Sequence, residues 1–308
     1  MGGREQAEPR RTRSKDRPAA VELPEQRFRE LDSYRVEREW KRYEGTPQRE
    51  LLLELRVRFL REHPAPVGGD RLELGPGPGR FTPYLAAPGQ RIILVDLSRE
   101  ALRQHRVRQT LPATGADYRI ERVLGNGRRP PLRDGSFVGV SLLGNLLGFA
   151  GPHADELLEA AARLVAPGGL LTVELSAGDG EYSECLHRLP PSAAARLLRA
   201  PLRAVLARVA RAGFVPTRTD PTGPGRFRRI SIRSADTTLD PLGFQLEAAE
   251  AIAPALGGDP ERTFACHSDP LAWGHLLELE ERLGKVPARW KRATALMAAY
   301  RRSSPTIK

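Results

Sequence analysis

The chain has little cysteine and no long apolar run, and both shortages limit what it can be. Cys185 and Cys266, its only cysteines, lie far apart in 308 residues, so a disulfide framework is not expected. No stretch reaches the roughly 18–20 apolar residues of a membrane span, because glycines interrupt the longest candidate, residues 137–150. The N-terminus also lacks the apolar segment of a secretory signal. The sequence therefore predicts a cytoplasmic protein without a membrane span.

Acidic residues and lysine are scarce as well. The net charge is +11, and 44 of the 49 basic residues are arginine. Between Arg196 and Arg233 ten arginines face a single acid, Asp220. Residues 196–211 have the pattern of an amphipathic helix, with aliphatic residues on one face and arginine on the other. This pattern predicts either a solvated face or a surface for RNA or anionic lipid, and without a stacking aromatic motif RNA would be bound through its backbone.

The remaining pattern divides the chain into four parts. Residues 1–20 are polar and charged and are expected to form a disordered tail; residues 21–66 read as an N-terminal helical segment with a helix start at Thr46-Pro47. From 67 to 235, helices alternate with strands expected at 71–74, 91–95, 118–124, 137–143, 170–175, 215–219 and 227–233. This alternation predicts an α/β fold with a doubly wound, mainly parallel, seven-stranded sheet. Residues 236–308 are expected to form a C-terminal helical extension, with helices near 245–256, 271–283 and 290–301.

The segment Glu73–Phe81, with the sequence ELGPGPGRF, is the most informative. A predicted strand runs into a turn in which glycine lets the backbone approach a ligand, and the following helix offers free N–H groups. The dinucleotide fingerprint would need glycine where Arg80 stands, and the phosphate loop would need Gly-Lys-Ser/Thr. Both classes of nucleotide site are therefore excluded here.

The spacing Glu-x-Gly-x-Gly-x-Gly resembles motif I of the class I S-adenosylmethionine-dependent methyltransferases. The resemblance continues along the chain, because Asp96 ends the second predicted strand 17 residues after Gly79. Further similar segments are Pro131–Phe137, Leu164–Leu175 and Ala212–Phe214. The matching order covers about residues 70–233, which is roughly half the chain.

The resemblance implies the class I methyltransferase fold and S-adenosylmethionine as cofactor. It implies that Glu73 and the glycines hold the amino-acid part of the cofactor and that Asp96 accepts both ribose hydroxyls. Asn126 stands where the family commonly has an aspartate that contacts adenine, and its side-chain carbonyl can still accept a hydrogen bond. The expected cofactor-binding residues are Glu73, Gly75, Gly77, Gly79, Asp96, Leu97, Asn126 and Leu143. No metal site is expected.

The methyl acceptor is less defined. In this fold it lies beyond the carboxyl ends of strands four and five, where Asn145, His153 and Glu174 are weak catalytic candidates. Asn145 also suits a turn, and His153 suits either a general base or an exposed helix start. The flanking helical segments are expected to cover the cofactor, with Trp40 and Tyr43 either in that cover or in the core.

Absent motifs narrow the reaction. No Asn/Asp-Pro-Pro-Tyr/Phe and no Pro-Cys follow strand four, which weighs against methylation of adenine N6 and of cytosine C5. The predicted function is methyl transfer to a nitrogen or oxygen of a small molecule. Two alternatives stay open: an RNA (tRNA or rRNA) methyltransferase that uses Arg196–Arg233, and a non-catalytic binding protein on the same fold. The oligomeric state is not predicted.

Overall fold

A computed structural model describes residue 29 and residues 32–41, 45–85, 89–105, 119–176, 181–212, 214–216, 229–256, 259–290, 293 and 295–304. The predicted tail, residues 1–20, lies outside the described residues, and so do Tyr43 and most of residues 213–228. Among the described residues, no helix is both long and apolar enough to cross a membrane.

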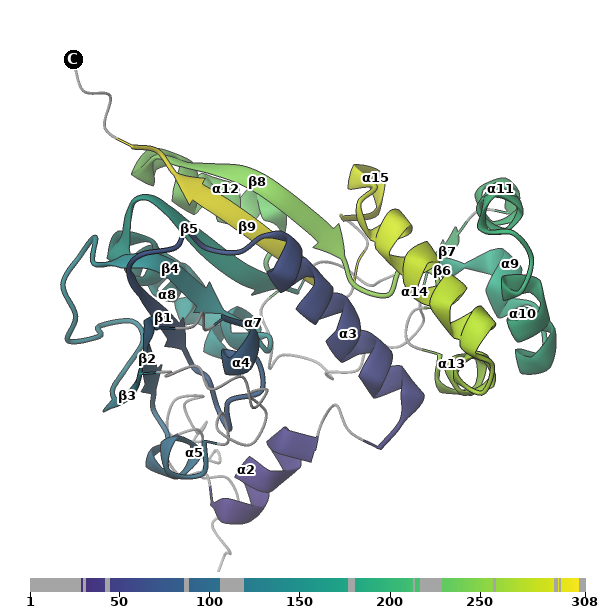
Figure 1. Cartoon of the computed structure of the whole chain (residues 1–308). Coiled ribbons are helices and arrows are strands. Elements are labelled where there is room, and N and C mark those ends of the chain that lie inside the picture. Colours follow the sequence, from purple (N-terminus) through teal and green to yellow (C-terminus); the bar gives the residue numbers. More distant parts are fainter. Residues whose placement is uncertain are drawn as a thin grey trace, which may run out of the picture.

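A seven-stranded sheet lies at the centre of the molecule (Figure 1). Its strands are β1 (Asp70–Leu74), β2 (Arg91–Asp96), β3 (Arg119–Leu124), β4 (Phe137–Leu142), β5 (Val165–Leu175), β8 (Phe244–Ala251) and β9 (Leu296–Arg302). Their order across the sheet is β3-β2-β1-β4-β5-β9-β8. Strands β1 to β5 are parallel to one another, whereas β9 is antiparallel to both β5 and β8. The predicted fold, a doubly wound and mainly parallel seven-stranded sheet, is confirmed.

The origin of the last two strands differs from the prediction. The expected strand at 215–219 is a three-residue strand, β7 (Phe214–Pro216), which pairs with β6 (Glu181–Ser183) outside the main sheet. The prediction of a strand at 227–233 is wrong for the described residues of that range, because helix α12 (Ile232–Leu239) begins there. The sheet is completed instead by β8 and β9, from the segment predicted to be helical. Their alanine, leucine and glutamate favour helices in isolation, and tertiary packing overrides that preference.

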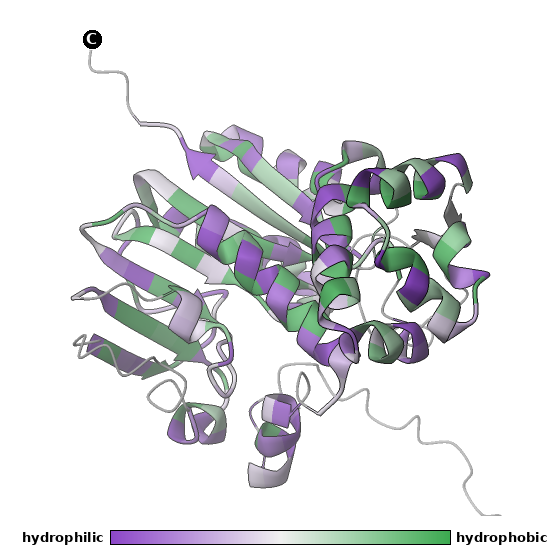
Figure 2. Ribbon diagram, turned by 45° about the vertical axis from the view of Figure 1, so that its right-hand side comes forward, coloured by the Kyte–Doolittle hydropathy of each residue, from purple (hydrophilic) through white to green (hydrophobic). Residues whose placement is uncertain are grey.

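Helices cover both faces of the sheet (Figures 1 and 2). On one face lies α3 (Pro47–Glu62), whose Leu51, Leu55 and Phe59 pack in one apolar cluster with residues of β2, β5 and β9. On the other face lie α8 (Ala154–Leu164) and α12, in a second cluster with β1, β4 and β5. The helix start predicted at Thr46-Pro47 is confirmed, since Thr46 caps α3 by accepting from the Arg49 N–H.

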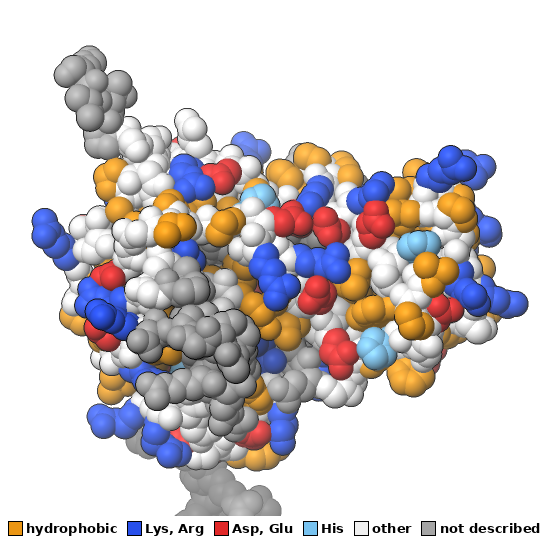
Figure 3. Space-filling model, viewed as in Figure 1, with side chains coloured by type: hydrophobic (Ala, Val, Ile, Leu, Met, Phe, Trp, Pro, Cys, Tyr) orange, Lys and Arg blue, Asp and Glu red, His pale blue; other side chains and the backbone are white. Residues whose placement is uncertain are grey.

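A helical lobe stands beside the sheet, at the right of Figure 1. It contains α9 (Glu184–His187), α10 (Pro191–Leu198), α11 (Leu202–Ala212), α13 (Pro260–His267) and α14 (Pro270–Gly284). The helix predicted across 193–212 is broken at Pro201, where a kink or start was expected, and the helix predicted at 271–283 corresponds to α14. Basic side chains gather at the outer end of this lobe in Figure 3. The exposed arginines of α10, α11 and their junction are Arg196, Arg199, Arg203, Arg208 and Arg211.

Candidate functional site

A cavity of about 390 Å³ opens at the carboxyl ends of β1, β2 and β4. Its walls are the loops that follow these strands, together with α2 (Ser33–Trp40) and α7 (Leu146–Ala150). The chain order reverses between β1 and β4, so the cavity lies at the topological switch point where open α/β sheets bind ligands. Its volume lies within the roughly 300–1,000 Å³ of small-molecule sites.

The loop that follows β1, residues 75–80, here called the glycine loop, forms the floor of this cavity. Its glycines have different structural roles. A Cβ built on Gly77 would meet no atom within 4 Å, so the missing side chain leaves open space for a ligand. Gly77 and Gly75 line the cavity, and the Gly75 N–H donates to the Val95 carbonyl at 2.8 Å, which ties the loop to β2. Gly79 is not among the lining residues. A Cβ there would lie 2.3 Å from His105 Nε2, so Gly79 makes room for the histidine ring.

Asp96 is buried at the end of β2 and lines the cavity. Its Oδ2 accepts from the Gly77 N–H at 3.0 Å and its Oδ1 from the Ser98 N–H at 2.8 Å. Burial raises the pKa of the Asp96 carboxyl, and these backbone donors act in the opposite direction. The Leu97 N–H is a third backbone donor to this carboxylate, so of its roughly four acceptor positions at least one is left for a ligand hydroxyl.

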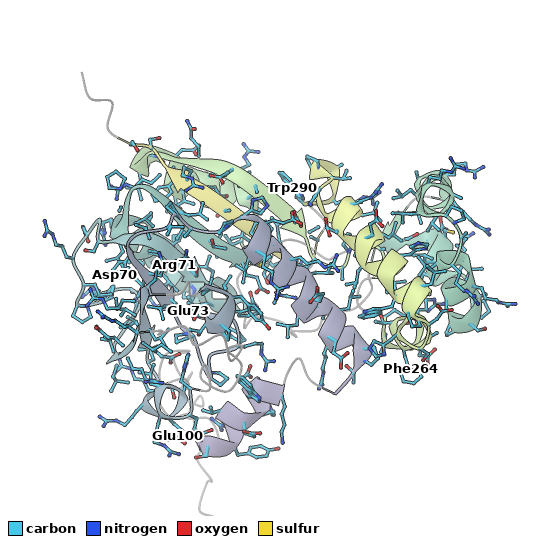
Figure 4. The ribbon with its side chains drawn as sticks, viewed as in Figure 1. Asp70, Arg71, Glu73, Glu100, Phe264 and Trp290 are labelled. Carbon is cyan, nitrogen blue, oxygen red and sulfur yellow. The ribbon has the colours of Figure 1, made fainter. Side chains whose placement is uncertain are left out.

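Glu73 is the second buried carboxyl group on the cavity wall (Figure 4). Thr82 Oγ1 donates to Glu73 Oε2 at 2.5 Å, and the same hydroxyl lies 3.0 Å from His105 Nε2. Burial raises the pKa of Glu73 to about 7; the Thr82 hydrogen bond opposes this rise, and the negative charge of Asp96 adds to it. Beside these two carboxyl groups the cavity favours a positively charged part of a ligand, while four arginines line the cavity as well.

The other expected cofactor residues also reach the cavity. Leu97, Asn126 and Leu143 all line it. The Asn126 side-chain carbonyl accepts from the Arg128 N–H at 3.0 Å, which fixes the turn after β3. Seven of the eight predicted residues therefore come together around one space, and Gly79 alone lies behind the loop.

Helix α2 closes one side of the cavity, as expected for a flanking segment. Val36, its buried residue, lines the cavity together with Arg35, Arg38 and Glu39. Arg80 of the glycine loop donates to the Glu39 carbonyl at 2.6 Å, and its guanidinium lies 5.5 Å from the centre of the Trp40 ring. Trp40 thus helps to hold α2 against the glycine loop and does not itself line the cavity.

The sequence did not identify several lining residues. They are Arg35, Val36, Arg38, Glu39, Arg80, Phe81, Arg128, Phe149 and Ala150. One signal was present, because Val36 is an apolar residue within a short helix of otherwise mostly polar residues. The supporting pair Thr82 and His105 carried no recognisable signal.

The three catalytic candidates do not line the cavity, and their role stays a prediction. Asn145 has a left-handed backbone (φ 62°) at the start of α7, and its Oδ1 accepts from the Ser176 hydroxyl at 2.9 Å. His153 Nδ1 lies 3.1 Å from the Arg128 guanidinium and 3.5 Å from Glu156.

Glu174, the third candidate, is part of a buried ion pair. Arg56 of α3 holds its two oxygens at 2.8 and 3.3 Å. Glu174 Oε2 also accepts from the Gly144 N–H at 3.0 Å, which pins the cavity-lining loop after β4. In this arrangement Glu174 does not line the cavity but holds one of its loops in position.

A separate cluster joins Glu62, His63 and Glu250, whose potential ligand atoms lie within 4.8 Å of one another. The Lys285 ammonium lies 2.9 Å from Glu62 and 3.7 Å from Glu250. Lys285 therefore supplies a cation to both carboxylates, and the cluster is part of an ion-pair network between α3, β8 and the residue that follows α14.

Comparison with known families decides the class of this site. Residues 72–173 match the model of a methyltransferase domain family. Residues 72–173 form a methyltransferase domain. The match runs from β1 to β5 and includes the glycine loop, Asp96 and Leu143. It confirms the predicted family and agrees with the predicted cofactor, S-adenosylmethionine. No curated protein matches the chain.

Several solved structures are similar to most of the chain. Magnesium protoporphyrin IX methyltransferase from Synechocystis PCC 6803, with bound S-adenosylhomocysteine, is 14% identical, with 88% of this chain and 95% of that chain covered and a TM-score of 0.48. Geranyl diphosphate C-methyltransferase from Streptomyces coelicolor is 12% identical, with 81% and 77% covered and a TM-score of 0.42. The [4+2]-cyclase SpnF is 14% identical, with 81% and 80% covered and a TM-score of 0.47. At such values the similarities say nothing about the substrate.

Proposed function

We propose that this chain is an S-adenosylmethionine-dependent methyltransferase that transfers a methyl group to a nitrogen or oxygen of a small molecule. One observation carries the proposal. Two buried carboxyl groups, Glu73 and Asp96, face a single cavity beside an open glycine, Gly77, at the switch point of a methyltransferase domain.

The residues around the cavity fit the cofactor. Glu73 suits its cationic amino group, and Asp96 suits its ribose, because the carboxylate retains an acceptor position for a hydroxyl group. Leu97 and Asn126, on the β2 and β3 loops, are assigned to the adenine, and Leu143, after β4, to the methionine part.

The chain itself has mainly to bind and to orient. S-adenosylmethionine supplies a methyl group on a sulfonium, which is a good leaving group. Alignment of the acceptor with that group can account for most of the rate enhancement, since positioning alone can be worth roughly 7–11 kcal/mol. Helix α2 covers the cavity and limits water. A neutral amine needs no dedicated base.

The α7 side of the cavity supports a small organic acceptor. Leu146, Phe149 and Ala150 form an apolar wall there, beyond the carboxyl end of β4. Apolar walls with few polar groups are typical of pockets for small molecules.

The arginine face of the helical lobe favours the second candidate function, an RNA methyltransferase. Helices α10 and α11 contain no acidic residue, and Arg203, Arg208 and Arg211 of α11 are exposed. Their pairing with phosphates would make binding steeply dependent on salt. A third possibility, a non-catalytic binding protein, shares the cavity but predicts no turnover.

Transfer of labelled methyl from S-adenosylmethionine into cell extract, split into small-molecule, RNA and protein fractions, separates these functions. Label in the small-molecule fraction is the expected result. Ribonuclease-sensitive label that is reduced by replacing Arg203, Arg208 and Arg211 with glutamine would establish the RNA function instead. Cofactor binding without label in any fraction would favour the binding protein.

A further inference from the structure

A buried series of three hydrogen-bonded polar side chains lies directly behind the cavity. It runs from His105, which follows α5 (Arg99–Arg103), through Thr82 at the start of α4 (Thr82–Leu85) to Glu73 on β1. All three side chains are buried, with Thr82 0% and His105 8% exposed. Because an unmade hydrogen bond is costly in such a place, these contacts are specific and not incidental.

When Glu73 is ionised, as binding of a cation requires, the proton count fixes the direction of these hydrogen bonds. The Thr82 hydroxyl has one proton, which it donates to Glu73 Oε2. Towards His105 it can then act only as an acceptor, so His105 Nε2 carries the hydrogen, a tautomer assigned from the network. Burial lowers the pKa of His105 to about 4, so the ring is neutral at physiological pH and has one N–H to give.

The second oxygen of Glu73 faces the ligand space. Among the described residues, Thr82 is the hydrogen-bond donor that reaches this carboxyl group, and it engages Oε2. Glu73 itself lines the cavity. Oε1 is therefore available to a donor that enters from the cavity, while the Thr82 bond restrains rotation of the carboxyl group.

We propose that Thr82 and His105 are positioning residues, which hold Glu73 so that Oε1 binds the ammonium group of the cofactor. The proposal rests on the proposed function. It also explains why a glycine stands at position 79. A side chain there would displace His105, which donates to Thr82.

The arrangement makes ligand binding depend on pH in a defined way. An ammonium group binds the ionised form of Glu73, whose pKa in the ligand-free protein is about 7. Binding therefore releases a proton, and affinity for an ammonium-bearing ligand increases as pH rises through about 7. Removal of the Thr82 hydrogen bond, which opposes the high pKa, moves this increase to higher pH.

Two ligands that differ in the amino-acid part provide the test. S-adenosylhomocysteine carries the ammonium group as its only cation, whereas 5′-methylthioadenosine has the adenosine and the sulfur but no amino-acid group. Calorimetric affinities of both ligands are measured between pH 6 and pH 8.5 for the wild-type protein, Thr82→Val, Thr82→Ser and Thr263→Val. Thr263 is an equally buried threonine of α13, outside the cavity, and is the matched control.

The expected result is selective. Thr82→Val weakens S-adenosylhomocysteine about tenfold at pH 7, as expected for a lost hydrogen bond to a charged group. It leaves 5′-methylthioadenosine unchanged, and it moves the pH midpoint upward. Thr82→Ser restores the wild-type values, and Thr263→Val changes neither ligand.

Two results would overturn the inference in different ways. Equal losses for both ligands in Thr82→Val, or no loss for either, would refute the positioning role and leave the proposed function standing. A wild-type protein that binds neither ligand would refute the proposed function, and the inference with it. His105→Phe is the second variant, and it should reproduce the ligand selectivity of Thr82→Val with a smaller loss.

Discussion

At the scale of single residues, the site combines two carboxyl groups that burial makes hard to ionise. Glu73 and Asp96 both have raised pKa values for this reason, and the negative charge of Asp96 raises the pKa of Glu73 further. Ionisation of such a pair is unfavourable in the ligand-free protein and becomes favourable when a cation binds beside it. Asp96 and Glu73, which the sequence identified by type and spacing, are the residues with this property.

The cost of the buried Glu73 carboxylate can be measured as stability. Its pKa is raised from 4.5 to about 7, so its contribution to stability is fully present below about pH 4.5 and is lost as pH rises to about 7. The loss is about 3 kcal/mol, at 1.36 kcal/mol per pKa unit. Glu73→Gln should therefore be more stable than wild type at pH 8 and not at pH 4.5, in urea unfolding without ligand.

An exposed carboxylate is the control for that experiment. Glu159→Gln on α8 should leave the pH dependence as in wild type, because Glu159 is half exposed in its ion pair with Arg163. If Glu73→Gln followed the wild-type stability at both pH values, the buried carboxyl would have no such cost.

The glycine loop offers a second comparison at this scale. Gly79→Ala places a methyl group 2.3 Å from His105 Nε2 at φ +90°, whereas Gly77→Ala, at φ +54°, points into open space. We expect Gly77→Ala to cost roughly 1–2 kcal/mol of stability, the price of a left-handed residue, and Gly79→Ala to cost clearly more. Relative to the stability that each variant loses, Gly77→Ala should nevertheless weaken the binding of S-adenosylhomocysteine more than Gly79→Ala does. Urea unfolding and calorimetry check both, and unimpaired binding by Gly77→Ala would contradict the cavity assignment.

At the scale of elements, sequence patterns predicted β1 to β5 as short segments that contain aliphatic residues and alternate with turns or helices. Strands β1 and β2 are buried along almost their whole length, as is typical of parallel strands covered on both faces, whereas the edge strand β3 is not buried. Strands β8 and β9 were missed because FQLEAAEA and LMAAYRR favour helices locally. Only the two-sided burial of Ala298, Ala299 and Tyr300 between β5 and β8 makes β9 a strand, and no local pattern carries that information.

Helix α3 is joined to the sheet by the buried ion pair of Arg56 and Glu174, and the same carboxylate pins Gly144 in the cavity wall. Arg56→Met should cost about 3–5 kcal/mol in urea unfolding, because it leaves Glu174 as an uncompensated buried charge. Arg58→Met, on the same helix with half-exposed partners, should cost less than about 1 kcal/mol.

The double variant Arg56→Met, Glu174→Gln sharpens this prediction. Removal of both charges should recover part of the stability that Arg56→Met loses. A double variant no more stable than the single one would show that the packing of Arg56, and not its charge, joins the helix to the sheet.

At the scale of the whole molecule, side chains of both charge signs line the cavity of a chain whose net charge is +11. Glu73 and Asp96 lie in the cavity wall, arginines line it as well, and further exposed arginines lie on the helical lobe. Sequence alone placed seven of eight proposed cofactor residues around one space, because the carboxyl ends of neighbouring parallel strands must meet. It predicted that the flanking helical segments cover the cofactor, but it could not identify the α2 residues that line the cavity, since the contacts of Arg80 with Glu39 and Trp40 depend on a long-range arrangement.

The most direct test of the account is calorimetric binding of S-adenosylmethionine to the full chain and to Asp96→Ala. Wild-type binding that weakens by roughly 1–3 kcal/mol in Asp96→Ala, as expected for lost hydrogen bonds to a charged group, is the predicted result. Asp134→Ala, which removes an exposed carboxylate outside the cavity, should bind as wild type does. No binding by the wild-type chain, or equal affinity in Asp96→Ala, would contradict the assignment of this cavity to the cofactor.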